Sequence, residues 1–373
     1  MANVREVTSL PLARSFVDLL GAHGYRNVSD ILSCQPFDLS QEMKITLEEA
    51  LEIIRTAHQS TTSDISQTAK DLIQKQGENM IITFSRNIDR MLGGGVCIGQ
   101  VTEICGVPGI GKTQLAMQLC VDVQVPSVFS GVEGHAVYID TEGSFIPERE
   151  REIATVLHNH LTKIAKRSTT PEQSAAMSRS LSLISPDSLL KGIHVYRPLD
   201  ATELMSVLTH LPGFLSQYTQ IRLVVVDSIA FHYRQDISDR GTRNRSLSQI
   251  SQLLQSIAHE YNVAVVLINH VTTHFDPVSG SSAIVPALGV FWHHCVTNRI
   301  MLSWKDNNRV ASLVKSPSRP ETSVIFTITS DGVRDMKKAT VEGIKTANKS
   351  LISHYEVNSI NNNNNNTSSI ISK

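Results

Sequence analysis

The sequence lacks long hydrophobic runs and any marked excess of one charge. Its longest apolar runs, such as Val263–Ile268, have the length of a strand, well short of the roughly 18 residues that a membrane helix needs. We therefore predict a chain that does not span a membrane. The 34 lysines and arginines nearly balance the 35 aspartates and glutamates, and the formal net charge of −1 argues against a histone-like cationic protein.

Cysteine is also scarce. The five cysteines are odd in number, are scattered through the chain and are never spaced as Cys-x-x-Cys. This spacing argues against a disulfide framework or a zinc site and favours a reducing compartment. The N-terminal segment has no apolar core of a secretory signal, and the acids among its arginines disfavour a transit peptide.

The length of 373 residues exceeds what a single hydrophobic core usually supports, and the character of the sequence changes near residue 80. We expect a small all-α domain at residues 1–58 and a polar linker at 59–79. A larger core should follow at 80–335, and a disordered Asn-rich tail at 336–373.

Apolar residues at helical spacing predict the helices of the first domain. Leu47, Leu51 and Ile54 share one face of the third helix, and Thr46 with Glu49 forms a capping box that opens it. The predicted helices are Ser15–Leu20, Val28–Cys34 and Thr46–His58.

Five short apolar runs without clean alternation lie in the larger core, as in strands buried on both faces. Helical stretches separate most of them, which is typical of a parallel sheet covered by helices. The expected fold class is therefore α/β with a mainly parallel sheet. The predicted strands are Gln100–Cys105, Ala136–Asp140, Gly192–Tyr196, Leu223–Asp227 and Val263–Ile268.

A glycine-rich segment after the first of these strands matches the P-loop pattern GxxxxGK[ST] at every fixed position. Its glycines would let backbone N–H groups converge on phosphate oxygens. Lys112 is expected to reach the β- and γ-phosphates, and the Thr113 hydroxyl to hold Mg²⁺. A chance glycine-rich turn between a strand and a helix is the alternative. The predicted phosphate-binding residues are Gly106, Val107, Pro108, Gly109, Ile110, Gly111, Lys112 and Thr113.

Carboxylates follow two other predicted strands. Asp227 ends one of them, as a Walker-B acid does, and can orient Mg²⁺, although a helix cap or turn former is the alternative. Asp140 and Glu142 follow another strand, at the edge where open α/β sheets place ligands. Glu142 is our candidate for activating water, with Asp140 in support, and two turn-forming acids are the alternative.

Several motifs, in this order, closely resemble those of eukaryotic RecA-type DNA recombinases. They include GVPGIGKTQ at Gly106–Gln114, YIDTEGSF at Tyr138–Phe145, LVVVDSIA at Leu223–Ala230 and KSPS at Lys315–Ser318. The resemblance covers roughly Ser9–Asp335, and within the family the chain is most similar to the C-type paralogue of the strand-exchange recombinase. It implies a RecA-like P-loop ATPase core preceded by a helix–hairpin–helix-like domain.

The resemblance also implies a function. It indicates a slow, DNA-dependent ATPase that uses ATP and Mg²⁺ and binds single-stranded or branched DNA in a complex with other RecA-type paralogues. The implied process is homologous recombination and double-strand-break repair, including meiotic recombination, in the nucleus. A non-hydrolysing assembly adaptor with a structural nucleotide site is the alternative. The implied site residues are catalytic Glu142 and Lys112, Mg²⁺-binding Thr113 and Asp227, and nucleotide-binding Gln114 and Arg149, the last near the adenine.

Two segments correspond to the family's DNA-facing loops, Tyr233–Ser246 and Val271–Leu288. The first has a local excess of positive charge with Tyr233 as a stacking aromatic, which suits single-stranded DNA, although a solvated charged loop is the alternative. The second has no lysine or arginine. The candidate DNA-binding residues are Arg234, Arg240, Arg243 and Arg245.

Three positions depart from the family pattern. His270 stands where a glutamine senses the γ-phosphate, and both altered ATP–DNA coupling and a tolerated substitution stay open. Ser66 replaces the phenylalanine of a Phe-x-x-Ala docking peptide, which favours a mixed complex over a homopolymeric filament. The turn at Met43–Ile45 lacks the glycine of a DNA-binding hairpin, which favours protein docking.

Overall fold

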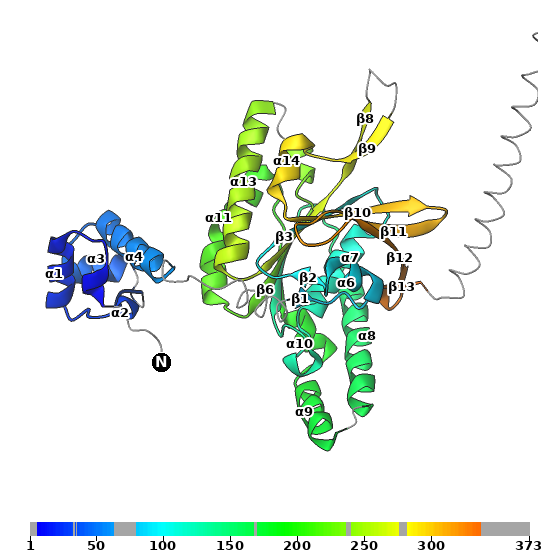
Figure 1. Ribbon diagram of the computed structural model, residues 1–373, viewed down its shortest axis with the longest axis horizontal. Helices are drawn as coiled ribbons and strands as arrows, with labels where there is room; N and C mark the ends of the chain where they lie inside the picture. Colours follow the sequence, from blue (N-terminus) through cyan, green and yellow to red (C-terminus); the bar gives the residue numbers. More distant parts are fainter. Residues whose placement is uncertain are drawn as a thin grey trace, which may run out of the picture. The chain divides into compact units, whose positions relative to one another are not determined.

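The structure is a computed structural model that describes residues 6–32, 34, 36–62, 80–167, 170–235, 240–275 and 282–336. The chain divides into two compact units, Met1–Lys75 and Gln76–Lys373 (Figure 1). Each unit has hydrophobic clusters of its own. Among the described residues, no helix combines the length and apolarity that a membrane span requires.

The first unit is a set of short helices. The predicted capping box is confirmed, because Thr46 N donates to Glu49 Oε2 at 2.8 Å and Glu49 N donates to Thr46 Oγ1 at 3.2 Å. Apolar spacing does not predict the helix at Pro36–Met43. The helix at Leu47–Thr62 continues into the stretch that we expected as linker. The elements are η1 (Val7–Ser9), α1 (Arg14–Ala22), α2 (Val28–Leu32), α3 (Pro36–Met43) and α4 (Leu47–Thr62).

Helix α4 packs on the core of the first unit mainly through residues outside the predicted face, although Ile54 of that face also packs against the core. Ala50, Ile53 and Ala57 are fully buried. Leu47 and Leu51 are 49% and 42% exposed. The helix therefore presents part of its apolar surface to solvent.

The second unit is built on a nine-stranded sheet. Its strands are β3 (Val101–Gly106), β4 (His135–Asp140), β5 (Ile193–Tyr196), β6 (Ile221–Asp227), β7 (Ala264–Asn269), β10 (Asn298–Lys305), β11 (Asn308–Lys315), β12 (Thr322–Thr329) and β13 (Gly332–Asp335). They lie in the order β13-β12-β11-β10-β3-β7-β6-β4-β5. The run from β10 to β5 is parallel, and β11–β13 continue it in antiparallel fashion. The predicted α/β fold with a mainly parallel sheet is confirmed.

Two further pairs of strands are antiparallel and separate from the main sheet. The first pair joins β1 (Met80–Ile81) to β2 (Val96–Cys97). The second joins β8 (Val271–Phe275) to β9 (Ser282–Pro286). The prediction of a loop over 271–288 is therefore wrong in its described part, which is mainly a β-hairpin.

Helices cover both faces of the sheet (Figure 1). Successive strand residues point to opposite faces, so Val225 packs in the cluster with α7 and α8, whereas Val224 packs in the cluster with α11 and α13. The helices of this unit are α6 (Arg86–Leu92), α7 (Lys112–Asp122), η2 (Ser127–Phe129), α8 (Pro147–Lys166), α9 (Pro171–Ser182), α10 (Pro186–Lys191), α11 (Ala201–Gln217), α12 (Phe231–Gln235), α13 (Arg240–Glu260) and α14 (Gly289–Cys295).

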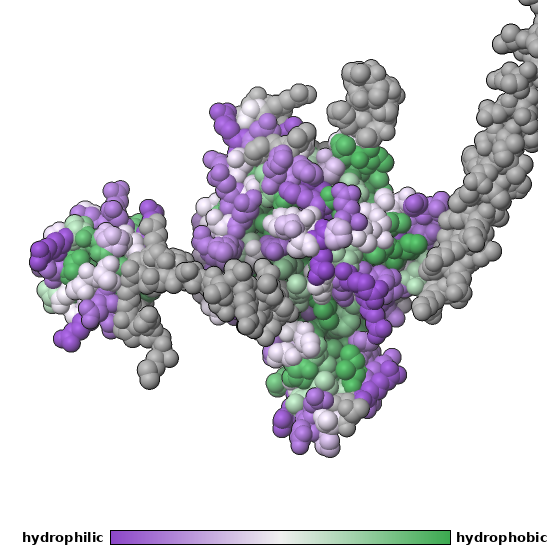
Figure 2. Space-filling model, viewed as in Figure 1, coloured by the Kyte–Doolittle hydropathy of each residue, from purple (hydrophilic) through white to green (hydrophobic). Residues whose placement is uncertain are grey.

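Helix α9 projects from the body of the second unit and contributes no buried residue. Leu183, just after it, is 82% exposed. Figure 2 shows hydrophobic residues gathered around α9 and α10 and near the β8–β9 hairpin.

A terminal clasp joins the start and the end of the second unit. The clasp consists of Ser85, Arg86 and Asn87 at the start of α6 and Asp335 at the end of β13. Asp335 Oδ1 accepts hydrogen bonds from Ser85 Oγ at 2.6 Å and Asn87 N at 3.1 Å, and Oδ2 accepts one from Arg86 N at 3.1 Å. The carboxylate of the last described strand therefore satisfies backbone donors of helix α6, the first helix that the structure describes in this unit.

Candidate nucleotide-binding site

The P-loop turn connects β3 to α7. Gly109 and Gly111 have φ values of 74° and 112°, a region that side-chain-bearing residues rarely adopt. A Cβ at Gly111 would collide with Ile328 of β12, whereas a Cβ at Gly109 would meet no atom within 4 Å. Ile110 is fully buried and anchors the turn. Ile110 and Ile328 therefore pack closely at the turn, whereas the space beside Gly109 is open.

Lys112 begins α7 and folds back over this turn. Its Nζ donates hydrogen bonds to the carbonyl oxygens of Gly106 at 3.0 Å and Val107 at 3.2 Å. Burial lowers the pKa of the amine, and the negative charges of Asp227 and Glu142 oppose that change. A phosphate oxygen could replace either carbonyl as the partner of Nζ.

Thr113 and Asp227 meet beside the P-loop. Thr113 Oγ1 donates to Asp227 Oδ2 at 2.7 Å, and the Tyr138 hydroxyl donates to the same oxygen at 2.7 Å. Burial raises the pKa of Asp227, although both hydrogen bonds favour its ionised form. A hydroxyl and a carboxylate side by side are oxygen donors of the kind that Mg²⁺ prefers. The residues present therefore fit a nucleotide phosphate with Mg²⁺.

Glu142 lies in the turn that follows β4, with its side chain 26% exposed. Its Oε1 accepts a short hydrogen bond from Ser228 Oγ and lies 2.6 Å from His270 Nε2. The hydrogen bond from His270 holds the pKa of Glu142 below its usual value, and Ser228 acts in the same direction against burial. Among the described residues, Oε2 has no hydrogen-bond partner. That oxygen can therefore accept a proton from water.

Asp140 shapes the turn that carries Glu142 instead of duplicating its function. Its buried carboxylate accepts hydrogen bonds from Ser144 N at 2.9 Å and Phe145 N at 3.2 Å. Arg197 Nε lies 3.4 Å from the same carboxylate. The turn-former alternative therefore describes Asp140 better than a role in water activation.

Arg149 links the end of the P-loop to the β12–β13 turn. Its Nε donates to Gln114 Oε1 at 2.9 Å. Its two terminal nitrogens donate to the carbonyls of Ser330 and Thr329, each at 2.8 Å. Gln114 and Arg149, predicted from separate motifs, are thus in direct contact beside the P-loop.

The structure adds residues that the motifs do not indicate. Arg309 Nε donates to the Ile110 carbonyl at 3.2 Å, and its guanidinium lies 4.5 Å from the ring centre of Trp304. These two residues are cross-strand partners in β10 and β11. Ser228 directly follows Asp227, and Tyr138 lies two positions before Asp140, so the motifs could have drawn attention to both. Nothing in the sequence indicates the contacts of Arg309.

The candidate DNA-binding arginines do not form the expected loop. Arg234 lies in α12, and Arg240 begins α13, which also carries Arg243 and Arg245. The side chains of Arg234 and Arg240 lie outside the described residues, as do positions 236–239. Arg245 is exposed and Arg243 is partly buried.

The prediction that Tyr233 stacks on a base is wrong for this conformation. The side chain is 1% exposed and packs in the hydrophobic cluster with α11 and α13. Burial of the Tyr233 ring, in the middle of α12, outweighs the polarity of the segment that follows.

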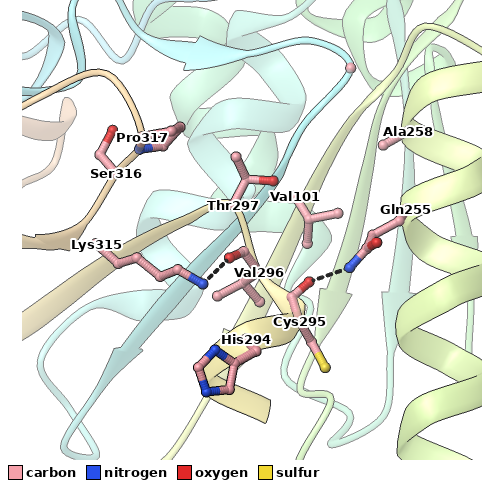
Figure 3. A pocket seen from close by; sticks show the side chains of 11 residues that line it. Val101, Gln255, Ala258, His294, Cys295, Val296, Thr297, Lys315, Ser316 and Pro317 are labelled. Carbon is pink, nitrogen blue, oxygen red and sulfur yellow. Dashed lines mark hydrogen bonds between the residues drawn. The ribbon is translucent and has the colours of Figure 1, made fainter. Parts of the chain in front are cut away.

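A pocket of about 540 Å³ lies away from the P-loop, where β3 and β10 begin (Figure 3). Lys315, the first residue of the KSPS motif, donates from Nζ to the Val296 carbonyl at 2.7 Å. Gln255 of α13 donates to the Cys295 carbonyl at 2.8 Å. Thr297 N donates to the Val101 carbonyl at 2.9 Å, which places the pocket at the amino ends of these strands. The nucleotide motifs lie at their carboxyl ends.

Comparison with known proteins places the chain in a family. The family model Rad51 matches residues 74–166 and 165–336. The chain is 38% identical over 343 residues to the DNA repair protein RAD51 homolog 3 of Cricetulus griseus, a match that covers 89% of this chain and 92% of that protein. It is 43% identical over 266 residues to the protein of the same name from Dictyostelium discoideum, covering 71% and 68%.

An archaeal relative extends the similarity. The DNA repair and recombination protein RadA of Aeropyrum pernix is 31% identical over 337 residues, and the match covers 89% of this chain and 97% of that protein. Both the family model and these relatives span the P-loop and the sheet that carries it. The chain therefore belongs to the Rad51 family, which confirms the RecA-type recombinase indicated by its motifs.

Proposed function

We propose that the chain is an ATP- and Mg²⁺-dependent, DNA-binding recombinase paralogue that hydrolyses ATP slowly. It would act in the nucleus in homologous recombination and double-strand-break repair, including meiotic recombination and the processing of branched DNA. One observation carries the proposal. Lys112 and Thr113 begin α7, Asp227 ends β6 and Glu142 follows β4, and the four side chains gather at the carboxyl edge of the sheet.

The residues of this edge divide the chemistry among them. Lys112 would bind phosphate oxygens, and Thr113 with Asp227 would hold Mg²⁺. When bound, the metal neutralises charge that develops on the phosphates. Glu142 Oε2 would orient the attacking water and accept its proton, while Ser228 holds the other carboxylate oxygen. Gln114 and Arg149 would contact the nucleotide beyond the phosphates, with Arg149 near the adenine.

Binding of single-stranded or branched DNA is proposed for Arg234, Arg240, Arg243 and Arg245. Arg245 is exposed near the start of α13, where it can neutralise a phosphate. The Nε atom of Arg243 is buried and has no hydrogen-bond partner among the described residues, so that side chain has an unsatisfied donor. Stacking by Tyr233 is not part of this proposal.

Other RecA-type paralogues are the proposed protein partners. Strand β5 is an edge of the main sheet, and Leu199 beside it is 80% exposed. A pocket of about 380 Å³, lined in part by Tyr196 and Phe214, opens next to this edge. An edge strand with an apolar pocket suits an extended peptide that carries one large side chain. The docking segment predicted in this chain, with Ser66, lies outside the described residues.

The first unit supports protein docking as well. Leu47 and Leu51 present an apolar face of α4 to solvent. Lys44, in the turn before α4, has a φ of 55°, a conformation in which a DNA-binding hairpin would use glycine. We therefore assign partner binding, and not DNA binding, to this unit.

An assembly adaptor with a structural nucleotide site is the second candidate. The observation that favours it is internal pairing, because Lys112 bonds to its own loop and Glu142 to Ser228 and His270. In that case nucleotide would stabilise the complex without turnover.

DNA-stimulated ATP turnover by the purified complex separates the two candidates. We expect Glu142→Gln to lower turnover by about 10²- to 10⁴-fold with little loss of nucleotide affinity. Lys112→Ala should weaken nucleotide binding about 10- to 100-fold and abolish nucleotide-dependent DNA or partner binding. No turnover in the unmodified complex, with nucleotide-dependent assembly intact, would favour the adaptor. Unchanged behaviour of Lys112→Ala in every assay would refute both.

A further inference from the structure

Arg309 donates a hydrogen bond to the P-loop from strand β11, outside the nucleotide motifs. Its Nε lies 3.2 Å from the Ile110 carbonyl oxygen. The Ile110–Gly111 peptide is trans, and the C=O and N–H groups of a trans peptide point in opposite directions. The contact therefore turns the Gly111 N–H away from Arg309. Among the described residues, no acceptor bonds to this N–H.

A tight hairpin sets the position of Arg309. Asp306 and Asn307 join β10 to β11, and their φ values of 48° and 62° are typical of a two-residue type I′ turn. This turn fixes the register in which Arg309 pairs with Trp304 across the two strands. The guanidinium lies 4.5 Å from the centre of the Trp304 ring. The ring therefore holds the guanidinium while Nε reaches the P-loop.

The orientation of the Ile110–Gly111 peptide needs a contact from outside, because the residue that follows the peptide is a glycine. Glycine adopts φ values on both sides of zero, so Gly111 itself does not prevent the peptide from turning over. A carbonyl oxygen would then replace an N–H on the phosphate-binding side and would repel the anion. A Cβ at position 111 would collide with Ile328, so a bulkier residue cannot supply the restraint.

We propose that Arg309 is a positioning residue for nucleotide binding, which holds the Ile110–Gly111 peptide so that the Gly111 N–H donates to a phosphate. Trp304 acts through Arg309, because its ring holds the guanidinium. Both roles rest on the proposed nucleotide site. Arg309 contacts the loop and not the nucleotide, so its effect reaches the phosphate through one backbone N–H.

Nucleotide affinity of the full-length chain gives the first test. A hydrogen bond to a charged group changes a dissociation constant by about 10-fold or more, so Arg309→Ala should weaken binding of ATPγS with Mg²⁺ about 10-fold. Trp304→Ala should weaken it about threefold, and Trp304→Phe should keep most of the affinity. Arg222→Ala is the matched control and should change nothing. Arg222 also donates to backbone carbonyls, at 2.7 and 2.8 Å, but near the start of β6.

The amide signal of Gly111 separates positioning from a general loss of structure. An isoleucine precedes a glycine only at Ile98–Gly99 and Ile110–Gly111. Labelling of isoleucine with ¹³C at the carbonyl and of glycine with ¹⁵N therefore selects these two amides in an NMR spectrum. Gly99 N donates to the Val263 carbonyl at 3.0 Å, away from the P-loop, so its signal is the internal reference.

In the unmodified chain, we expect nucleotide to shift the Gly111 signal and to leave the Gly99 signal in place. In Arg309→Ala the Gly111 signal should move before any nucleotide is added, because the peptide is no longer held. If Arg309→Ala does not fold, Trp304→Ala repeats both measurements with a change to a side chain that is 47% exposed.

Two outcomes would overturn the inference while the proposed function stands. One is full affinity for ATPγS in Arg309→Ala. The other is weaker binding with the Gly111 signal of the nucleotide-free variant unchanged. Failure of the unmodified chain to bind nucleotide would overturn both the inference and the proposed function.

Discussion

Asp227 and Glu142 are two carboxylates of one site whose surroundings change their pKa values in opposite directions. Burial raises the pKa of Asp227, which makes its charge costly until a cation is near. The hydrogen bonds from His270 and Ser228 lower the pKa of Glu142 and keep it ionised. This contrast suits one residue to metal binding and the other to accepting a proton.

A third carboxylate, Glu150, lies outside the site, and its burial destabilises the folded state when it is ionised. It is fully buried in the first turn of α8, and neither oxygen has a hydrogen-bond partner among the described residues. Burial, with the nearby charge of Asp122, holds its pKa well above the usual value. Its folded pKa exceeds its unfolded pKa, so its contribution to stability is complete in acid and is lost as the pH rises towards the folded pKa.

We expect Glu150→Gln to stabilise the protein at pH 8 by at least about 1 kcal/mol, because glutamine has the same shape and no charge to bury. The gain should be smaller at pH 5. Urea unfolding at the two pH values measures it, and Glu148→Gln, exposed in the same helical turn, is the control. An equal gain at both pH values would contradict this explanation.

At the scale of elements, the four most deeply buried strands and the edge strand β5 were predictable, whereas β10–β13 were not. β3, β4, β6 and β7 are almost wholly buried, so most of their residues are apolar. In β12 most residues are partly exposed, and its mixed sequence does not stand out from a loop. The β8–β9 hairpin is likewise mixed in sequence, which is why it was expected as a loop.

The candidate site could be predicted to the level of which residues meet. Carboxyl ends of neighbouring parallel strands lie together, so the motifs indicated that Thr113, Asp227 and Glu142 would be close. The side-chain contacts could not be predicted, because Tyr138 and Ser228 reach their partners through rotamers set by tertiary packing. The roles of these residues stay predictions.

The edge strand β5 gives a prediction about assembly. Leu199→Asp would place a charge just after the edge strand β5 and should weaken binding of a RecA-type partner by about 10-fold or more. Leu199 is 80% exposed, so the fold should be unaffected. Copurification of partners with the tagged chain measures the effect. Leu183→Asp, 82% exposed after α9, is the control, and equal losses from both variants would reject the β5 edge as the docking site.

At the scale of the whole molecule, the two units have separate hydrophobic clusters and separate sets of contacts. All candidate nucleotide-binding residues belong to the second unit. We therefore expect the fragment Gln76–Lys373 to fold cooperatively and to bind ATPγS with the affinity of the full chain. Calorimetry and nucleotide titration of the fragment measure this, and an unfolded fragment would show that the division by contacts does not mark an independent domain.

The terminal clasp sets an order of events during synthesis. Helix α6 is made early, but the carboxylate that caps it belongs to Asp335, about 250 residues later. The hydrogen bonds from Arg86 N and Asn87 N to this carboxylate therefore cannot form until β13 has left the ribosome. A premature stop codon that spares every nucleotide motif but falls before position 335 would release a chain with that cap missing. Such a chain would lack the three hydrogen bonds of the clasp, even though its P-loop sequence is intact.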